Sequence, residues 1–213
     1  MTTKTGATGM DDDPARSAHP AHPARPDSPD RREGGAHDTG VMVSPVTRMD
    51  GDDLVAGNAA SRDFHAPWVA PFTDHDGFAK WFHQVATGAN VALVARRDDM
   101  AGAPGVIGVL TLSQIVHGTF CSAYLGYYAM KAQARRGLMT QALRMTVRHA
   151  FDAMGLHRLE ANIQPANLPS LALVRRVGFR CEGFSPRYLF IDGAWRDHER
   201  WAILSDDPAG RAA

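Results

Sequence analysis

The order of strand-like and helix-like segments restricts the fold of this 213-residue chain more than any other feature. Apolar runs separated by short turn-forming stretches predict an antiparallel meander of three strands, at 90–96, 106–114 and 120–129. After this meander, apolar residues recur at three- and four-residue steps over 140–154, as in an amphipathic helix. A strand at 157–164 and a helix at 168–177 follow.

Further elements are expected on both sides of this pattern. A strand at 41–46 and helices at 50–64 and 74–87 precede the meander, and strands at 180–191 and 195–204 close the chain. A strand–helix–strand unit between antiparallel pieces requires a mixed sheet with helices packed on it. We therefore expect an α/β (α+β) fold whose twisted, mostly antiparallel central sheet has about six to seven strands and about four flanking helices.

Composition sets the limits of the folded domain. Residues 1–40 contain five prolines and no Val, Ile, Leu, Phe, Trp or Tyr, so they bury nothing that offsets their ordering entropy. We expect a disordered low-complexity tail at 1–40, a folded domain at 41–206 and a flexible C-terminus at 207–213. Lys+Arg 23 and Asp+Glu 23 balance, which gives no basic field for nucleic acid or a membrane surface. With two widely spaced cysteines and no long apolar run, we expect a cytoplasmic protein without a metal site.

The segment before the helix at 140–154 has the composition of an anion-binding loop. It contains Arg135, Arg136 and Gly137, and a helix N-terminus presents unpaired N–H donors and a partial positive charge to phosphate-like groups. Neither the P-loop nor the Rossmann glycine pattern is present. An ordinary strand-to-helix turn with solubilising arginines remains an equal alternative on spacing alone.

Four segments, in the same order and spacing, resemble the RimJ/RimL group of the GNAT acetyltransferases, most closely its RimJ branch: AYLGYYA, RRGLMTQAL, LHRLEANIQPANLPSLALVRRVGF and RCEGFSPRYLFIDGAWRDHERWAIL. Enzymes of that group acetylate N-terminal amines of ribosomal proteins. The resemblance implies an acetyl-CoA-dependent N-acetyltransferase that is a monomer or homodimer and acts on the N-terminal α-amine of a protein. Two alternatives stay open: acetylation of a small amine (an antibiotic, polyamine or amino acid), and a non-catalytic acyl-CoA-binding module.

The resemblance also implies where the cofactor binds. In the family, backbone amides of an Arg/Gln-x-x-Gly-x-Gly/Ala loop hold the pyrophosphate; Gly137 matches the central glycine, whereas Ala134 and Met139 depart from the two ends. Arg135 or Arg136 is expected to replace the missing side chain. The expected cofactor-binding residues are Tyr127, Tyr128, Ala129, Arg135, Arg136, Gly137, Leu138, Met139, Thr140, Asn167 and Ser170.

Catalytic roles follow from the same resemblance. Asn167 is expected to bond the pantetheine arm and Ser170 to protonate the departing thiolate, although both residue types also suit a helix N-cap. A backbone N–H near Tyr127–Ala129 is expected to stabilise the oxyanion. An α-amine with a pKa of about 7.7–8.0 is partly neutral at pH 7 and needs no strong base. Glu160 is the candidate base, acting directly or through water, and the alternative is an exposed or ion-paired strand carboxylate.

Residues at the acceptor side are expected in one loop and one hairpin. Trp68 follows the first helix, where the family forms a wall of the acceptor cleft, although an aromatic there also serves packing. Tyr188 lies in the closing hairpin that borders the acceptor groove in such folds. Asp197 and His198 share that hairpin, where neighbouring arginines give them a structural alternative. Leu189 stands where RimL has a glutamate, so that glutamate's role is not transferred.

Overall fold

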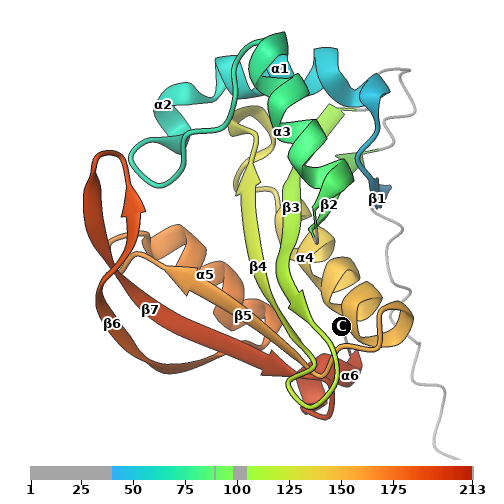
Figure 1. Ribbon diagram of the computed structural model, residues 1–213, viewed down its shortest axis with the longest axis vertical. Coiled ribbons are helices and arrows are strands. Elements are labelled where there is room, and N and C mark those ends of the chain that lie inside the picture. Colours follow the sequence, from blue (N-terminus) through green and yellow to red (C-terminus); the bar gives the residue numbers. More distant parts are fainter. Residues whose placement is uncertain (1–39, 89, 98–104, 213) are drawn as a thin grey trace, which may run out of the picture. The chain divides into compact units, whose positions relative to one another are not determined.

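A seven-stranded sheet forms the centre of the fold in the computed structural model, which describes residues 40–88, 90–97 and 105–212. The predicted tail at 1–40 therefore lies outside the described residues, except for Gly40. The strand order is β1-β2-β3-β4-β5-β7-β6, and β4 and β5 are the parallel pair in an otherwise antiparallel sheet (Figure 1). The strands are β1 (Val41–Pro45), β2 (Val91–Arg97), β3 (Gly105–Val116), β4 (Ser122–Ala129), β5 (Arg158–Ile163), β6 (Arg180–Ile191) and β7 (Ala194–Leu204). The expected mixed, mostly antiparallel sheet is confirmed.

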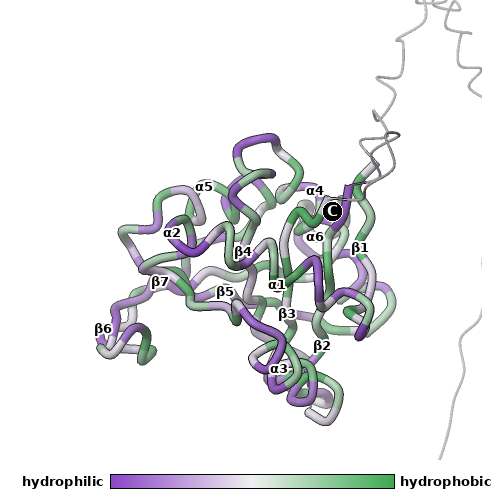
Figure 2. Tube along the Cα trace, turned by 90° about the horizontal axis from the view of Figure 1, so that it is seen from above, coloured by the Kyte–Doolittle hydropathy of each residue, from purple (hydrophilic) through white to green (hydrophobic). Residues whose placement is uncertain are grey.

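Helices cover both faces of the sheet (Figure 2). The α-helices are α1 (Gly51–Ala60), α2 (Arg62–His65), α3 (His75–Thr87), α4 (Leu138–Arg148), α5 (Leu168–Val177) and α6 (Pro208–Ala212). On one face, Leu143 of α4 and Val174 of α5 belong to the main core. On the other face, Leu54 of α1 and Phe78 of α3 form a second, smaller core with the sheet. Within the described ranges, no helix has the length and apolar character needed to cross a bilayer.

The helix expected at 50–64 is divided into α1 and α2 at Ser61. Ser61 is 2% exposed, and its Oγ accepts the Lys131 N–H at 3.0 Å. This hydrogen bond joins Ser61 to the segment after β4. Because the two residues lie far apart in the sequence, helical periodicity could not predict the bond. The helix expected at 140–154 begins two residues earlier, after Gly137, and ends in a π-helical turn at His149–Ala153.

The chain end, expected to be flexible from 207, contains the short helix α6. Ala209 packs against the main core, and Asp207 accepts the Leu204 N–H at 3.0 Å. Gly178, which ends α5 with φ 112°, makes this close packing feasible, because a Cβ there would lie 2.2 Å from the Cβ of Ala209. The half-buried Ala209 is thus the contact between α6 and the main core.

The divergence of β4 and β5 positions the candidate site. These strands pair only through Ser122–Tyr124 and Arg158–Glu160, and then separate (Figure 1). On its other side, β4 stays paired with β3 as far as Ala129. The last part of β4 therefore has a strand partner along one edge and none along the other.

Candidate active site

The loop before α4 exposes a run of main-chain donors. Gly137 is the N-cap with φ 76°, and Arg135 also has a left-handed φ of 61°. Such backbone turns direct successive N–H groups outward. Thr140 N–H bonds the Gly137 carbonyl at 3.1 Å, whereas the N–H groups of 135–139 have no acceptor within the described part of the chain. Unpaired N–H groups at a helix N-terminus are chemically suited to an anionic group such as a phosphate.

Side chains in this loop divide into buried and exposed groups. Leu138 and Thr140 are 5% and 6% exposed, so they offer a ligand only their main chain. Arg135 and Arg136 are exposed, and Arg136 Nη1 donates to Gln133 Oε1 at 2.8 Å. A Cβ on Gly137 would meet no atom within 4 Å, so the loop is open to its surroundings at this residue. The two exposed arginines add positive charge to the loop.

The edge of β4 that β5 leaves open carries further donors. Met130 N–H bonds the Ile107 carbonyl of β3 at 2.8 Å. In an antiparallel pair only every second residue bonds the neighbouring strand, so Tyr128 also faces β3. The main-chain groups of Tyr127 and Ala129 therefore face away from β3, toward the open edge. The Ala129 carbonyl accepts a hydrogen bond from His65, with Nε2 at 2.9 Å. The N–H groups of Tyr127 and Ala129 thus lie where the sequence predicts the oxyanion donor.

The start of α5 meets this edge. Asn167 is the N-cap of α5, and its Oδ1 accepts the Ser170 N–H at 3.2 Å. The helix-capping role that the sequence offered for Asn167 is therefore present. The Tyr127 hydroxyl lies 2.7 Å from Ser170 Oγ. Burial raises the pKa of Tyr127 far above its ordinary value, so the phenol keeps its proton. The structure thus brings two predicted site residues, Tyr127 and Ser170, into direct contact.

Glu160 lies on the opposite face of the sheet from α5. On β5, Leu159 and Ala161 point into the main core, and the alternation of a strand turns Glu160 the other way. Its Oε1 accepts a hydrogen bond from Arg158 Nε at 2.7 Å, and Arg158 also binds the carboxylate of Glu182 on β6. Glu160 is therefore ion-paired, which is the structural alternative to its role as a base.

Tyr188 reaches from β6 to a second tyrosine beside Glu160. Its hydroxyl lies 3.4 Å from that of Tyr124, the residue paired with Glu160 across β4 and β5. This hydrogen bond, together with burial, raises the pKa of Tyr124 to about 12. The Tyr188 ring packs edge-on to His198, with ring centroids 6.0 Å apart.

The other hairpin candidates make structural contacts. His198 is 2% exposed with Nδ1 3.0 Å from the Arg196 carbonyl, and burial lowers the pKa of His198. Asp197 accepts the Arg187 N–H at 2.7 Å, where the register of β6 and β7 shifts. Among the described residues, no group of three or more His, Cys, Asp or Glu side chains is arranged to hold a metal ion.

A cavity of about 520 Å³ adjoins the open edge on the α3 side of the sheet. Trp68 is not among its lining residues; the tryptophan that lines it is Trp81 of α3, which was not a predicted site residue. Lys80 is the one charged lining residue among those described. The cavity is lined by Val69, Ala70, Pro71, Phe72, Gly77, Lys80, Trp81, Gln84, Thr111, Gly126, Tyr127 and Tyr128.

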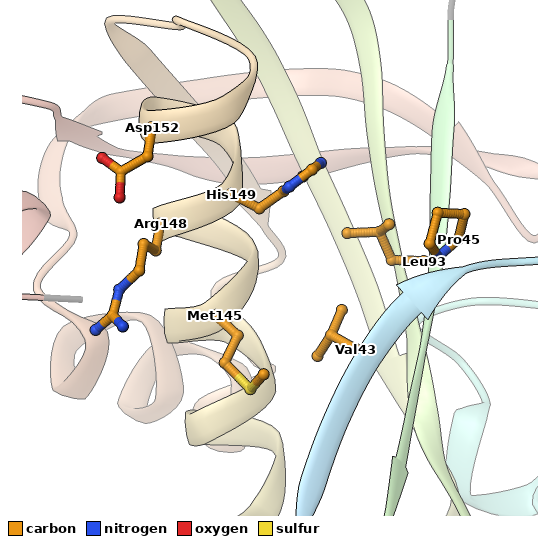
Figure 3. Close-up of a pocket in the computed structure, with 7 residues that line it drawn as sticks. All are labelled: Val43, Pro45, Leu93, Met145, Arg148, His149 and Asp152. Atoms are coloured by element: carbon orange, nitrogen blue, oxygen red, sulfur yellow. The ribbon is translucent and has the colours of Figure 1, made fainter.

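A second cavity, of about 380 Å³, lies between the β1 edge of the sheet and the end of α4. Val43, Pro45 and Leu93 form its apolar side, and among the labelled polar residues His149 points toward them (Figure 3). It shares no residue with the open edge of β4.

Comparisons with known proteins agree with this geometry. Residues 41–180 match the family model described as an acetyltransferase (GNAT) domain. The chain is 40% identical over 102 residues to the probable N-acetyltransferase YjcK of Bacillus subtilis and to the [ribosomal protein uS5]-alanine N-acetyltransferase of Escherichia coli. These matches cover 48% of this chain and 56% and 53% of the two relatives, so the chain spans about half the length of the curated relatives it matches.

A solved structure extends the similarity to most of the fold. Mycobacterium smegmatis RimJ, in complex with CoA-disulfide, is 31% identical with a TM-score of 0.70. The match covers 80% of this chain and 86% of that protein. Family model, sequence identity and fold lead to the same assignment: the chain belongs to the GNAT acetyltransferase family.

Proposed function

We propose that this protein transfers the acetyl group of acetyl-CoA to the N-terminal α-amine of a protein, by direct attack within a ternary complex. The observation that carries the proposal is the open edge of β4. Tyr127 on this edge contacts Ser170 through its hydroxyl and also lines the cavity on the α3 side. One strand thus connects the side proposed for the thioester with the side proposed for the amine.

Cofactor binding would use main-chain groups for the most part. The amides of 135–139 would hold the pyrophosphate of acetyl-CoA, supported by the charges of Arg135 and Arg136. The pantetheine arm would run along the open edge of β4, where Tyr127, Tyr128 and Ala129 lie. The side-chain amide of Asn167, whose Oδ1 is already used by the helix cap, would donate to that arm. The CoA-disulfide bound to the similar M. smegmatis RimJ supports this assignment.

The proposed reaction forms a C–N bond and breaks a C–S bond. The neutral α-amine attacks the thioester carbon, and the N–H groups of Tyr127 and Ala129 stabilise the oxyanion. On collapse the C–S bond breaks, Ser170 gives its hydroxyl proton to the departing thiolate, and Ser170 Oγ takes up a proton from water in return. The Tyr127 phenol, which stays protonated, would donate to Ser170 Oγ and so leave the serine O–H directed at sulfur. The proton lost by the amine would pass to water or to Glu160, which Arg158 holds in place.

The lining of the acceptor-side cavity favours a peptide over a polyamine. A polyamine carries several positive charges, which are bound best by carboxylates. The described lining residues include Lys80 and no Asp or Glu, so a polycation would be repelled there. An extended peptide needs only one neutral amine at the reacting end. Tyr188, whose hydroxyl contacts that of Tyr124, and Trp68, next to the lining residue Val69, would contact the following acceptor residues.

A single assay tests this function. The protein is incubated with acetyl-CoA and short peptides that begin with Ala or Ser, and release of free thiol is followed. The matched control is the same peptide with an acetylated N-terminus, and spermidine and free amino acids form a second panel. We expect thiol release only with the unblocked peptides. Release with small amines alone would select the small-molecule alternative, and CoA binding without any release would select a non-catalytic module.

A further inference from the structure

Side chains of α1 and α2 contact the last part of β4 and the residues just after it, where β5 no longer pairs with the strand. Asn58, Ser61 and His65 recur at three- and four-residue steps and so lie on one face of the helical segment. Asn58 Nδ2 lies 3.4 Å from the Tyr128 hydroxyl, and Ser61 Oγ accepts the Lys131 N–H at 3.0 Å. His65 Nε2 lies 2.9 Å from the Ala129 carbonyl oxygen. Each contact falls at or just beyond the end of β4.

The protonation state of His65 follows from its partner. A carbonyl oxygen only accepts hydrogen bonds, so Nε2 must carry the proton. The ring is 3% exposed and burial lowers the pKa of His65, which keeps the ring neutral and leaves Nδ1 without a proton. Nδ1 has no hydrogen-bond partner among the described residues. The single N–H of this ring is therefore committed to Ala129.

The orientation of the ring is fixed by packing. The Tyr128 ring meets the His65 ring edge-on, with centroids 5.1 Å apart and an interplanar angle of 70°. His65 is also the last residue of α2, so its main chain is set by the helix. A held ring can impose a position on the peptide that it bonds.

Ala129 is the residue whose position matters for the proposed reaction. In a complete sheet a neighbouring strand would donate an N–H to its carbonyl, but β5 pairs with β4 only as far as Tyr124. We propose that His65 is a positioning residue: its Nε2–H takes the place of the missing strand donor and keeps the N–H groups of Tyr127 and Ala129 directed at the thioester oxygen. This inference rests on the proposed function.

Two substitutions separate positioning from packing. His65→Leu retains much of the side-chain bulk but removes the N–H donor. His65→Gln retains an N–H donor that can reach the Ala129 carbonyl. For His65→Leu we expect kcat to fall about 10- to 100-fold, below the roughly 10²–10³-fold cost of losing an oxyanion donor outright. The KM for acetyl-CoA should change less than about threefold, because the loss falls on the transition state. His65→Gln should recover most of the lost kcat.

Val55→Ala is the control for packing. Val55 lies on α1 and packs on the same small core, but makes no hydrogen bond to β4, so its loss should lower thermal stability and leave kcat near the wild-type value. Equal kcat in His65→Leu and the wild type would overturn the inference. So would equal losses in the Leu and Gln variants, or a raised KM with unchanged kcat.

An NMR measurement keeps this inference separate from the proposed function. Ring ¹⁵N shifts of His65 in the wild-type protein should report the Nε2–H tautomer at pH values where exposed histidines titrate. A ring that is protonated on Nδ1, or that titrates near 6.5 like a free histidine, would refute the positioning contact even in an active enzyme. A wild-type protein that shows the expected tautomer but releases no thiol with any amine would refute the proposed function instead.

Discussion

Ser170→Ala should slow acetyl transfer strongly while leaving CoA affinity almost unchanged. General acids contribute about 10²–10⁴-fold, and a thiolate is a good leaving group, so we expect the lower end: about a 100-fold fall in kcat, or about 2.7 kcal/mol. Tyr127→Phe removes the hydroxyl that lies 2.7 Å from Ser170 Oγ. A neutral hydrogen bond is worth about 0.5–1.5 kcal/mol, which corresponds to a roughly 2- to 12-fold fall in kcat.

The two substitutions should be strongly coupled. In a Ser170→Ala background the Tyr127 hydroxyl has no serine to orient, so adding Tyr127→Phe should cost almost nothing more. The coupling energy should then be about 1 kcal/mol. It is measured from thiol-release rates at saturating acetyl-CoA for the wild type, both single variants and the double variant, with calorimetry of CoA binding for each.

The matched cycle pairs Ser170→Ala with Tyr128→Phe. The Tyr128 hydroxyl bonds Asn58 rather than Ser170, so the effects of these two substitutions should add. Additive losses for Tyr127 and Ser170 would refute the idea that the tyrosine acts through the serine. Unchanged turnover in Ser170→Ala would remove the serine from the mechanism.

Three further predictions concern the loop and the pH dependence of stability. Gly137→Ala should lower stability by about 1 kcal/mol, read as a fall in Tm, because a left-handed φ is costly with a Cβ, and should also weaken CoA binding. Burial alone would raise the pKa of Asp50, but hydrogen bonds from Arg96 and Thr47 outweigh it; Asp50→Asn should therefore destabilise the protein in urea at pH 7, with the difference lost as pH falls well below 3.8. Burial lowers the pKa of both His65 and His198, so the unfolded chain binds more protons below about 6.5; Tm should fall as pH drops from 6.5, and less steeply in His198→Gln.

Periodicity in the sequence was enough to predict the strands and the mixed sheet, because apolar alternation and helical spacing record burial directly. The break at Ser61 was not predictable in this way. It depends on a bond to Lys131, which lies far along the chain. The C-terminal helix α6 depends likewise on how closely Ala209 approaches Gly178.

In the candidate site, too, features set by local sequence could be predicted, and features set by distant residues could not. Gly137 could be singled out from the sequence, because a loop with glycine and arginines before an amphipathic helix presents unpaired N–H donors and positive charge. Arg158 and Glu160 lie two residues apart on one face of β5, so their ion pair could be offered as an alternative, whereas the second carboxylate on this guanidinium, Glu182, comes from β6 and could not. His65 was not among the predicted site residues, although Asn58, Ser61 and His65 recur as polar positions on one helical face of an otherwise apolar contact.

Calorimetric titration of the folded protein with CoA and with pantetheine tests the central claim most directly. The account predicts one CoA bound per chain and much weaker binding of pantetheine, which lacks the diphosphate that the amides of 135–139 are proposed to hold. Folded protein that takes up no CoA, or that binds pantetheine as tightly as CoA, would contradict it.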